Sequence, residues 1–157
     1  MKKILIVTLV LLLGLSATGF AQSKGWALGG AFAFDWAGSN AYPTRAALVV
    51  KFPGLPIMFG FSANFEDPVV VGVTADWWLF TTHLVGPVNL YLGPGLFLRF
   101  ATEGGTDPVF GIRIPIGFQI YIVKAFEIFL EPAVAIELLP TLPDFSLQAA
   151  LGFRFWF

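Results

Sequence analysis

Residues 110–122 have the sequence FGIRIPIGFQIYI, in which two kinds of residue alternate. Phe or Ile occupies every even-numbered position, and Gly, Pro, Tyr or a polar or charged residue occupies every odd-numbered one. A period of two places successive side chains on opposite faces of a β-strand. One face of this strand is therefore strongly apolar, whereas the other face carries Arg113 and Gln119.

The same alternation runs along the chain from Gly25 onward. It breaks seven times, where Gly, Pro, Asn and Asp collect, so the sequence predicts eight strands. The predicted strands are Gly25–Trp36, Thr44–Phe52, Ile57–Phe65, Val69–Phe80, Val88–Phe100, Val109–Ile122, Phe126–Glu137 and Phe145–Phe157. The predicted turns and loops are Ala37–Pro43, Pro53–Pro56, Glu66–Pro68, Thr81–Pro87, Ala101–Pro108, Val123–Ala125 and Leu138–Asp144.

The composition indicates apolar surroundings. The chain is 57% hydrophobic and 17% aromatic, with a mean hydropathy of +0.79, which is too apolar for an ordinary soluble domain. After residue 21, however, no run approaches the roughly 18 to 20 apolar residues of a membrane helix. A tilted strand of about ten residues covers the roughly 25 Å apolar band of an outer membrane. The chain has no cysteine, and its pI near 5.7 does not favour nucleic acid as a partner.

The first 21 residues are predicted to be a cleavable signal peptide. Lys2 and Lys3 precede an apolar segment from Ile4 to Leu15, and small residues stand before a cut after Ala21. A retained anchor helix is the alternative. Removing residues 1–21 leaves a barrel domain of residues 22–157, with seven basic and ten acidic residues and a formal charge of 7 minus 10, or -3.

Side-chain volume predicts which face of the sheet is inside. The polar face also carries eight glycines, whereas the other face is crowded with Phe, Trp, Leu and Ile. A soluble barrel of the lipocalin type would show the same alternation with the faces exchanged. The interior of an eight-stranded barrel is only wide enough for its side chains to fill, so the aromatic face is predicted to meet lipid. Closure is required because an open sheet edge in hydrocarbon leaves costly unpaired backbone groups.

The charged residues of the strands all fall on the predicted interior face, with five of each sign. Buried charges are tolerated when they are paired, so we expect a salt-bridged interior filled by side chains and ordered water. The alternative is a narrow ion path or gate. The predicted lumen charge network comprises Asp35, Arg45, Lys51, Asp76, Arg99, Arg113, Glu127, Glu131, Glu137 and Arg154.

An even number of strands predicts that both termini lie on the periplasmic side. The single histidine, His83, then falls in a periplasmic turn rather than beside Ser or Asp on the outer side, where a barrel hydrolase is expected to hold its base. The sequence therefore predicts no catalytic residue, no metal site and no cofactor.

The chain ends in LGFRFWF over residues 151–157, an alternating aromatic strand that closes on a C-terminal Phe. With GIRIPIG (111–117) and FLEPA (129–133), this ending resembles the small bacterial outer-membrane barrels of the OmpX, OmpW and OmpA-membrane-domain type, over essentially all of residues 22–157. The resemblance implies an all-β, eight-stranded antiparallel up-and-down transmembrane barrel in the outer membrane, surrounded by its lipid. It also implies that Phe153, Phe155 and Phe157 form the signal that the barrel assembly machinery recognises.

The resemblance does not fix an activity. These families include adhesion and resistance proteins, wall-linked anchors, pores and lipid-modifying enzymes, and fold does not imply function. The first hypothesis is a non-enzymatic barrel that serves envelope structure or surface interaction, with no surface ligand indicated. The alternative is a narrow pore or conduit for small or apolar solutes.

Overall fold

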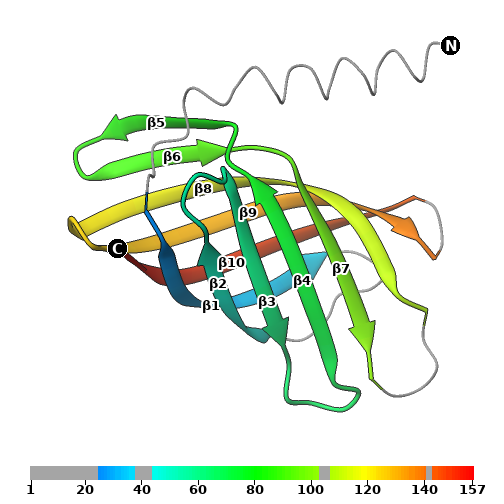
Figure 1. Cartoon of the computed structure of the whole chain (residues 1–157). Helices are drawn as coiled ribbons and strands as arrows, with labels where there is room; N and C mark the ends of the chain where they lie inside the picture. Colours follow the sequence, from blue (N-terminus) through cyan, green and yellow to red (C-terminus); the bar gives the residue numbers. More distant parts are fainter. Residues whose placement is uncertain (1–24, 38–43, 103–106, 141–142) are drawn as a thin grey trace, which may run out of the picture.

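The computed structural model describes residues 25–37, 44–102, 107–140 and 143–157 (Figure 1). The predicted signal peptide lies outside the described residues. Among these residues, no helix is long and apolar enough to cross a membrane. The described strands are β1 (Ala27–Ala37), β2 (Arg45–Lys51), β3 (Ile57–Ala63), β4 (Val70–Trp77), β5 (Phe80–Val85), β6 (Val88–Leu92), β7 (Gly95–Ala101), β8 (Val109–Val123), β9 (Phe126–Leu139) and β10 (Asp144–Trp156).

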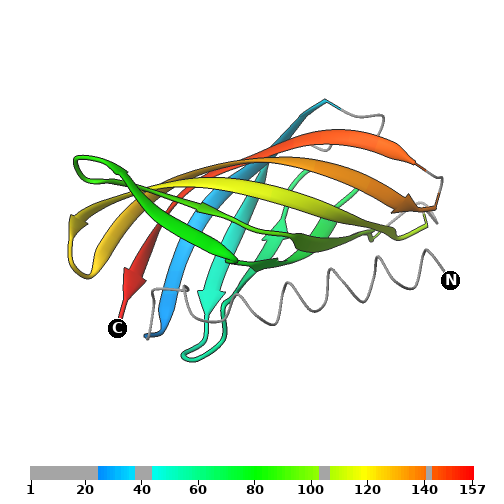
Figure 2. The same ribbon diagram turned by 90° about the horizontal axis from the view of Figure 1, so that it is seen from above.

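The strands close into an antiparallel barrel. Neighbours follow one another in the order β7-β4-β3-β2-β1-β10-β9, and β8 pairs with both β7 and β9 to complete the ring. Strand β5 continues β4, and β6 leads into β7, so the wall counts eight strands. The predicted eight-stranded up-and-down barrel is confirmed, and Figure 2 shows it from above.

The two long strands on one side of the barrel are interrupted at the same level. The breaks fall at Trp78–Leu79 and at Gly93–Pro94. Pro94 has no N–H to donate to a ladder, and a Cβ on Gly93 would overlap the carbonyl oxygen of Trp77. The chain thus bends where the two backbones approach most closely.

The predicted turn over Thr81–Pro87 is wrong. Strand β5 runs through most of it, and the hairpin turns only at Gly86, whose φ is 54°, and Pro87. The turn was predicted because Thr81, Thr82 and His83 are polar. Thr is β-branched, however, and fits a half-exposed strand well.

The strands are strongly staggered. A ladder followed across the wall passes from Ala27 to Ser146. The next residue, Leu147, lies opposite Ala37 on the first strand, so the circuit returns at least 37 minus 27, or ten, residues further along. A large stagger requires tilted strands. The partners along the circuit are Ala27, Lys51, Met58, Asp76, Gly95, Arg113, Ala135 and Ser146.

Burial alternates most clearly along β7, β8 and β9, as the sequence predicts. In β8, Ile112, Ile114 and Ile116 are exposed on the outer face, whereas Arg113 and Gln119 are buried on the lumen face. The lumen face also carries aromatic side chains. Those buried inside are Trp78, Tyr91, Phe97 and Phe129.

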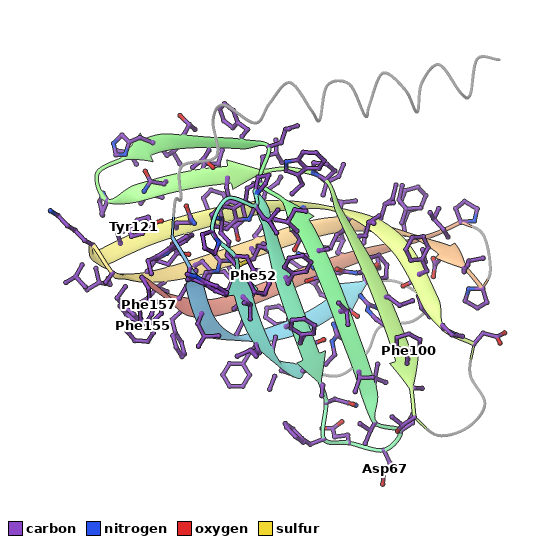
Figure 3. All side chains as sticks on the ribbon, viewed as in Figure 1. Phe52, Asp67, Phe100, Tyr121, Phe155 and Phe157 are labelled. Atoms are coloured by element: carbon purple, nitrogen blue, oxygen red, sulfur yellow. The ribbon has the colours of Figure 1, made fainter. Side chains whose placement is uncertain are left out.

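The two ends of the barrel differ. Phe52, Phe155 and Phe157 lie at the end where the chain terminates, which we call the terminal end, and Asp67 and Phe100 lie at the other, the loop end (Figure 3). Strands β1, β3, β7 and β9 end at the loop end, whereas β2, β5 and β8 end at the terminal end.

Candidate functional site: the charged lumen

Four charged side chains meet inside the barrel near the loop end, and we call them the loop-end cluster. They are Asp35 on β1, Arg45 on β2, Arg99 on β7 and Glu137 on β9. The carboxylate of Asp35 lies 3.1 Å from Arg45 Nη2 and 3.0 Å from Arg99 Nη1. Arg99 Nη1 is also 3.8 Å from Glu137 Oε1. One carboxylate therefore serves two guanidinium groups, and the cluster joins four strands across the lumen.

Five further charged side chains form the central cluster: Asp76, Arg113, Glu127, Glu131 and Arg154. Arg113 Nε lies 3.1 Å from Asp76 Oδ1, and Arg113 Nη2 lies 2.5 Å from Glu131 Oε1. Arg154 Nη1 lies 2.5 Å from Glu127 Oε1, and Arg154 Nη2 lies 3.7 Å from Glu131 Oε2. Glu131 thus links the two arginines into one network.

Neutral polar groups complete the central cluster. Arg154 Nη2 donates to the Tyr91 hydroxyl at 3.0 Å, and that hydroxyl in turn donates to Glu131 Oε2. Trp156 Nε1 donates to Glu127 at 2.7 Å, and Gln119 Nε2 donates to the same carboxylate at 3.2 Å. Charge-assisted bonds of this kind are stronger than neutral ones.

Aromatic rings surround the guanidinium of Arg154. Its carbon lies 3.6 Å from the centroid of Phe129, 5.1 Å from Trp78 and 5.5 Å from Tyr91. Trp78 and Tyr91 stack on each other with centroids 4.3 Å apart. A cation over an aromatic face is attracted by the ring quadrupole, most strongly where water is excluded, and Arg154 is 0% exposed. Of these three aromatic residues, Tyr91 lies on β6, Phe129 on β9 and Trp78 in the break between β4 and β5.

Nine of the ten predicted lumen residues therefore join ion pairs in these two clusters. The tenth, Lys51, is buried at the terminal end, where its Nζ lies 3.5 Å from the carbonyl oxygen of Phe52 and 5.9 Å from the Trp156 ring. Sequence reasoning missed Trp78, Tyr91 and Phe129. Their spacing could have predicted a place on the lumen face, since each falls an even number of residues from a buried charge or glycine on its strand.

A cavity of about 60 Å³ separates the two clusters. Arg45 and Arg99 of the loop-end cluster and Asp76 and Arg113 of the central cluster line it, and small side chains of β1 to β4 form much of the remaining wall. A water molecule needs roughly 10–15 Å³ of such space, so the cavity has room for a few waters between the charged groups.

The terminal aromatic residues and the histidine lie outside the lumen. Phe153 and Phe155 of β10, and Phe157 directly after it, are exposed on the outer face. His83 lies on β5 rather than in a turn, and its Nδ1 is 3.3 Å from Asn89 Oδ1. Among the described residues no group of three or more His, Cys, Asp or Glu is arranged to hold a metal ion.

No family model matches the sequence, and no curated protein matches it. Solved structures do match the fold, which is that of the small eight-stranded outer-membrane barrels. One is the N-terminal β-barrel domain of OprF from Pseudomonas aeruginosa, at a TM-score of 0.53 and 12% identity over 85% of this chain and 98% of that one. Another is Ail, the attachment invasion locus protein of Yersinia pestis, at a TM-score of 0.50 and 14% identity over 85% of this chain and 97% of that one. At these identities the likeness concerns the fold alone.

Proposed function

We propose that this chain is a non-enzymatic integral barrel of the bacterial outer membrane, with a lumen that the two charged clusters close, and that it serves envelope structure or surface interaction. The membrane location is supported by the outer face, where exposed Phe, Leu and Ile cover the wall. A continuous apolar surface of this kind on a closed barrel matches hydrocarbon and not water. The terminal end then faces the periplasm, and the short loops with Glu66, Asp67, Asp107 and Asp144 face outward.

The observation that carries the closed lumen is the placement of Arg154. Its side chain starts on β10, contacts rings from the opposite side of the barrel and is fully buried. The short ion pair to Glu127 and the aromatic rings around it support a lumen that is filled by side chains. An open porin, by contrast, keeps a water-filled polar channel.

The membrane location is tested first, by heat modifiability. The mature chain is refolded in detergent, and gel mobility and far-UV dichroism are compared before and after boiling. A compact β-rich species that shifts on boiling is expected. A species that is soluble without detergent would contradict a membrane barrel and favour a lipocalin-like carrier.

The closed lumen is tested by conductance in planar lipid bilayers. The folded wild-type protein is expected to give no discrete current steps, whereas Arg154→Ala, which removes the side chain that spans the lumen, is expected to give them. Ile116→Val on the outer face is the matched control and is expected to stay silent. Steps of equal size in the wild type and in Arg154→Ala would contradict the closed lumen.

The narrow pore remains the second candidate because the cavity between the clusters offers polar space inside the wall. Regular conductance steps in the wild type would favour it.

A further inference from the structure

The hairpin of β5 and β6 leaves one strand edge open at the terminal end. Strand β3 stops at Ile57, which pairs with Trp77, and the last bond from this side runs from the Trp78 N–H to the Pro56 carbonyl. Beyond it, β5 pairs only with β6, and among the described strands none lies along its other edge. The backbone from Phe80 to Val85 therefore presents unpaired N–H and C=O groups along one side.

This open edge projects beyond the closed part of the barrel. In both Figure 1 and Figure 2 the tip of the β5–β6 hairpin and the neighbouring β8–β9 turn reach past the C-terminus. Hydrocarbon cannot satisfy the free backbone groups of an edge strand. The edge therefore fits the periplasmic layer, a placement that rests on the function proposed above.

The edge lacks the usual protection against strand addition. Natural edge strands carry Lys, Pro or inward-pointing charges that prevent pairing with another chain. Strand β5 has the sequence FTTHLV and contains none of these. Phe80, Leu84 and Val85 are at least half exposed, and Ile122 and Val123 add apolar surface at the neighbouring turn.

A second copy of the chain does not fit this edge. Copies in one membrane share the same orientation, so a two-fold axis between them runs along the membrane normal. Antiparallel pairing of two β5 strands requires an axis perpendicular to the sheet, which would turn one copy upside down. Parallel pairing requires an axis along the strand, and barrel strands are tilted by roughly 35–45° from the normal.

We propose that the β5 edge accepts an extended segment of a periplasmic polypeptide as an added strand. Main-chain hydrogen bonds supply the affinity, and the exposed apolar side chains select a segment in which apolar and polar residues alternate. We expect this segment to be acidic. Lys124 is the single formally charged residue in 78–92, which contain the β5–β6 hairpin, and in 118–126, which contain the β8–β9 turn.

Hydrogen exchange of the protein in lipid vesicles tests this proposal. The probe is a synthetic peptide of about ten residues in which Val and Thr alternate and one end carries Glu, added in excess. Exchange of the β5 amides, residues 80–85, is expected to slow about tenfold or more as they enter a new ladder. A peptide with Lys in place of Glu is expected to protect them less, and one with Pro at alternate positions not at all.

Variants locate the effect on the edge. Leu84→Lys, which adds an edge-protecting charge and keeps the β5 backbone, is expected to abolish the protection. Phe65→Lys places the same charge at the loop end and is expected to leave it unchanged. The proposal is overturned if the acidic peptide leaves β5 exchange unaltered, or if protection without peptide rises with protein concentration, as for a second copy. Heat modifiability shows separately whether the protein has inserted into the membrane. A protein that fails to insert is therefore distinguished from an inserted protein whose β5 edge does not bind the peptide.

Discussion

The two charged clusters of the lumen hold their arginines in different ways. In the loop-end cluster, Arg45 and Arg99 share the carboxylate of Asp35, and Phe97 lies beneath Arg99 at 4.7 Å. In the central cluster, Arg154 has its own carboxylate in Glu127 and in addition a hydroxyl and three aromatic rings. The central cluster therefore surrounds its arginine with both polar and aromatic partners.

The difference shows that a counter-ion alone does not make a buried charge stable. Desolvation of an ion costs several kcal/mol, and a pair offsets that cost only when its geometry is good and further hydrogen bonds satisfy the remaining donors. Arg154 lies closer to its carboxylate, at 2.5 Å from Glu127 Oε1, than Arg45 and Arg99 lie to Asp35, at 3.1 and 3.0 Å. Perturbing the central cluster is thus expected to cost more than perturbing the loop-end cluster.

The largest expected effect comes from overfilling the central cluster. Gly117 lies on β8 against the ring of Tyr91, and a Cβ added there would overlap that ring. Gly117→Trp cannot be accommodated, and we expect no heat-modifiable species after refolding. Gly30→Trp is the matched control, because Gly30 lines a hollow on the outer face and a Cβ there meets Phe153 at an ordinary 3.5 Å. Equal yields of folded protein from both variants would reverse the assignment of inside and outside.

The next effect is the loss of one carboxylate from the central cluster. Glu127→Ala leaves Arg154 buried with Glu131 at 3.7 Å as its nearest carboxylate, and it also removes the acceptor for Gln119 and Trp156. We expect the free energy of unfolding to fall by about 3–5 kcal/mol, as for other broken buried pairs. Urea unfolding in detergent, followed by tryptophan fluorescence, measures it. Glu66→Ala at the exposed loop end is the control and is expected to change stability by less than about 0.5 kcal/mol.

The loop-end cluster is expected to tolerate the same change better. Glu137→Ala leaves Arg99 with Asp35 at 3.0 Å, so the guanidinium keeps its closer partner. We expect a loss of about 1.5–3 kcal/mol in the free energy of unfolding, comparable to one hydrogen bond to a charged group. A loss equal to that of Glu127→Ala in the same assay would remove the proposed difference between the clusters.

Much of the fold could be predicted from the sequence, because a period of two is a local property. Each strand separates polar from apolar residues, so the number of wall strands, their directions and the inside face follow from one strand at a time. The interruptions at Trp78 and Gly93 could not be predicted, since they arise from contact between two strands distant in sequence. The same holds for β5, whose polar residues indicated a turn although their β-branching favours a strand.

The composition of the lumen could be predicted, but its pairings could not. Alternation places Arg113 and Glu131 on the inner face, yet their contact depends on the stagger of the barrel, which no single strand reveals. Arg154 illustrates the gap most clearly. Its pairing with Glu127 is a cross-strand contact on neighbouring strands, whereas its contact with Trp78 reaches across the lumen.

The smallest expected effect lies on the outer face, beside the residue of the first prediction. Ile116 is directly adjacent to Gly117 but points away from the lumen and is 39% exposed. Ile116→Val removes one methylene from a side chain that the proposed membrane location places against lipid, and it leaves both clusters intact. We expect a change below about 0.5 kcal/mol in the same urea assay and unchanged gel mobility, because no cavity forms where lipid tails can refill the space. A larger loss would mean that Ile116 packs against protein, as a residue at an interface between copies would.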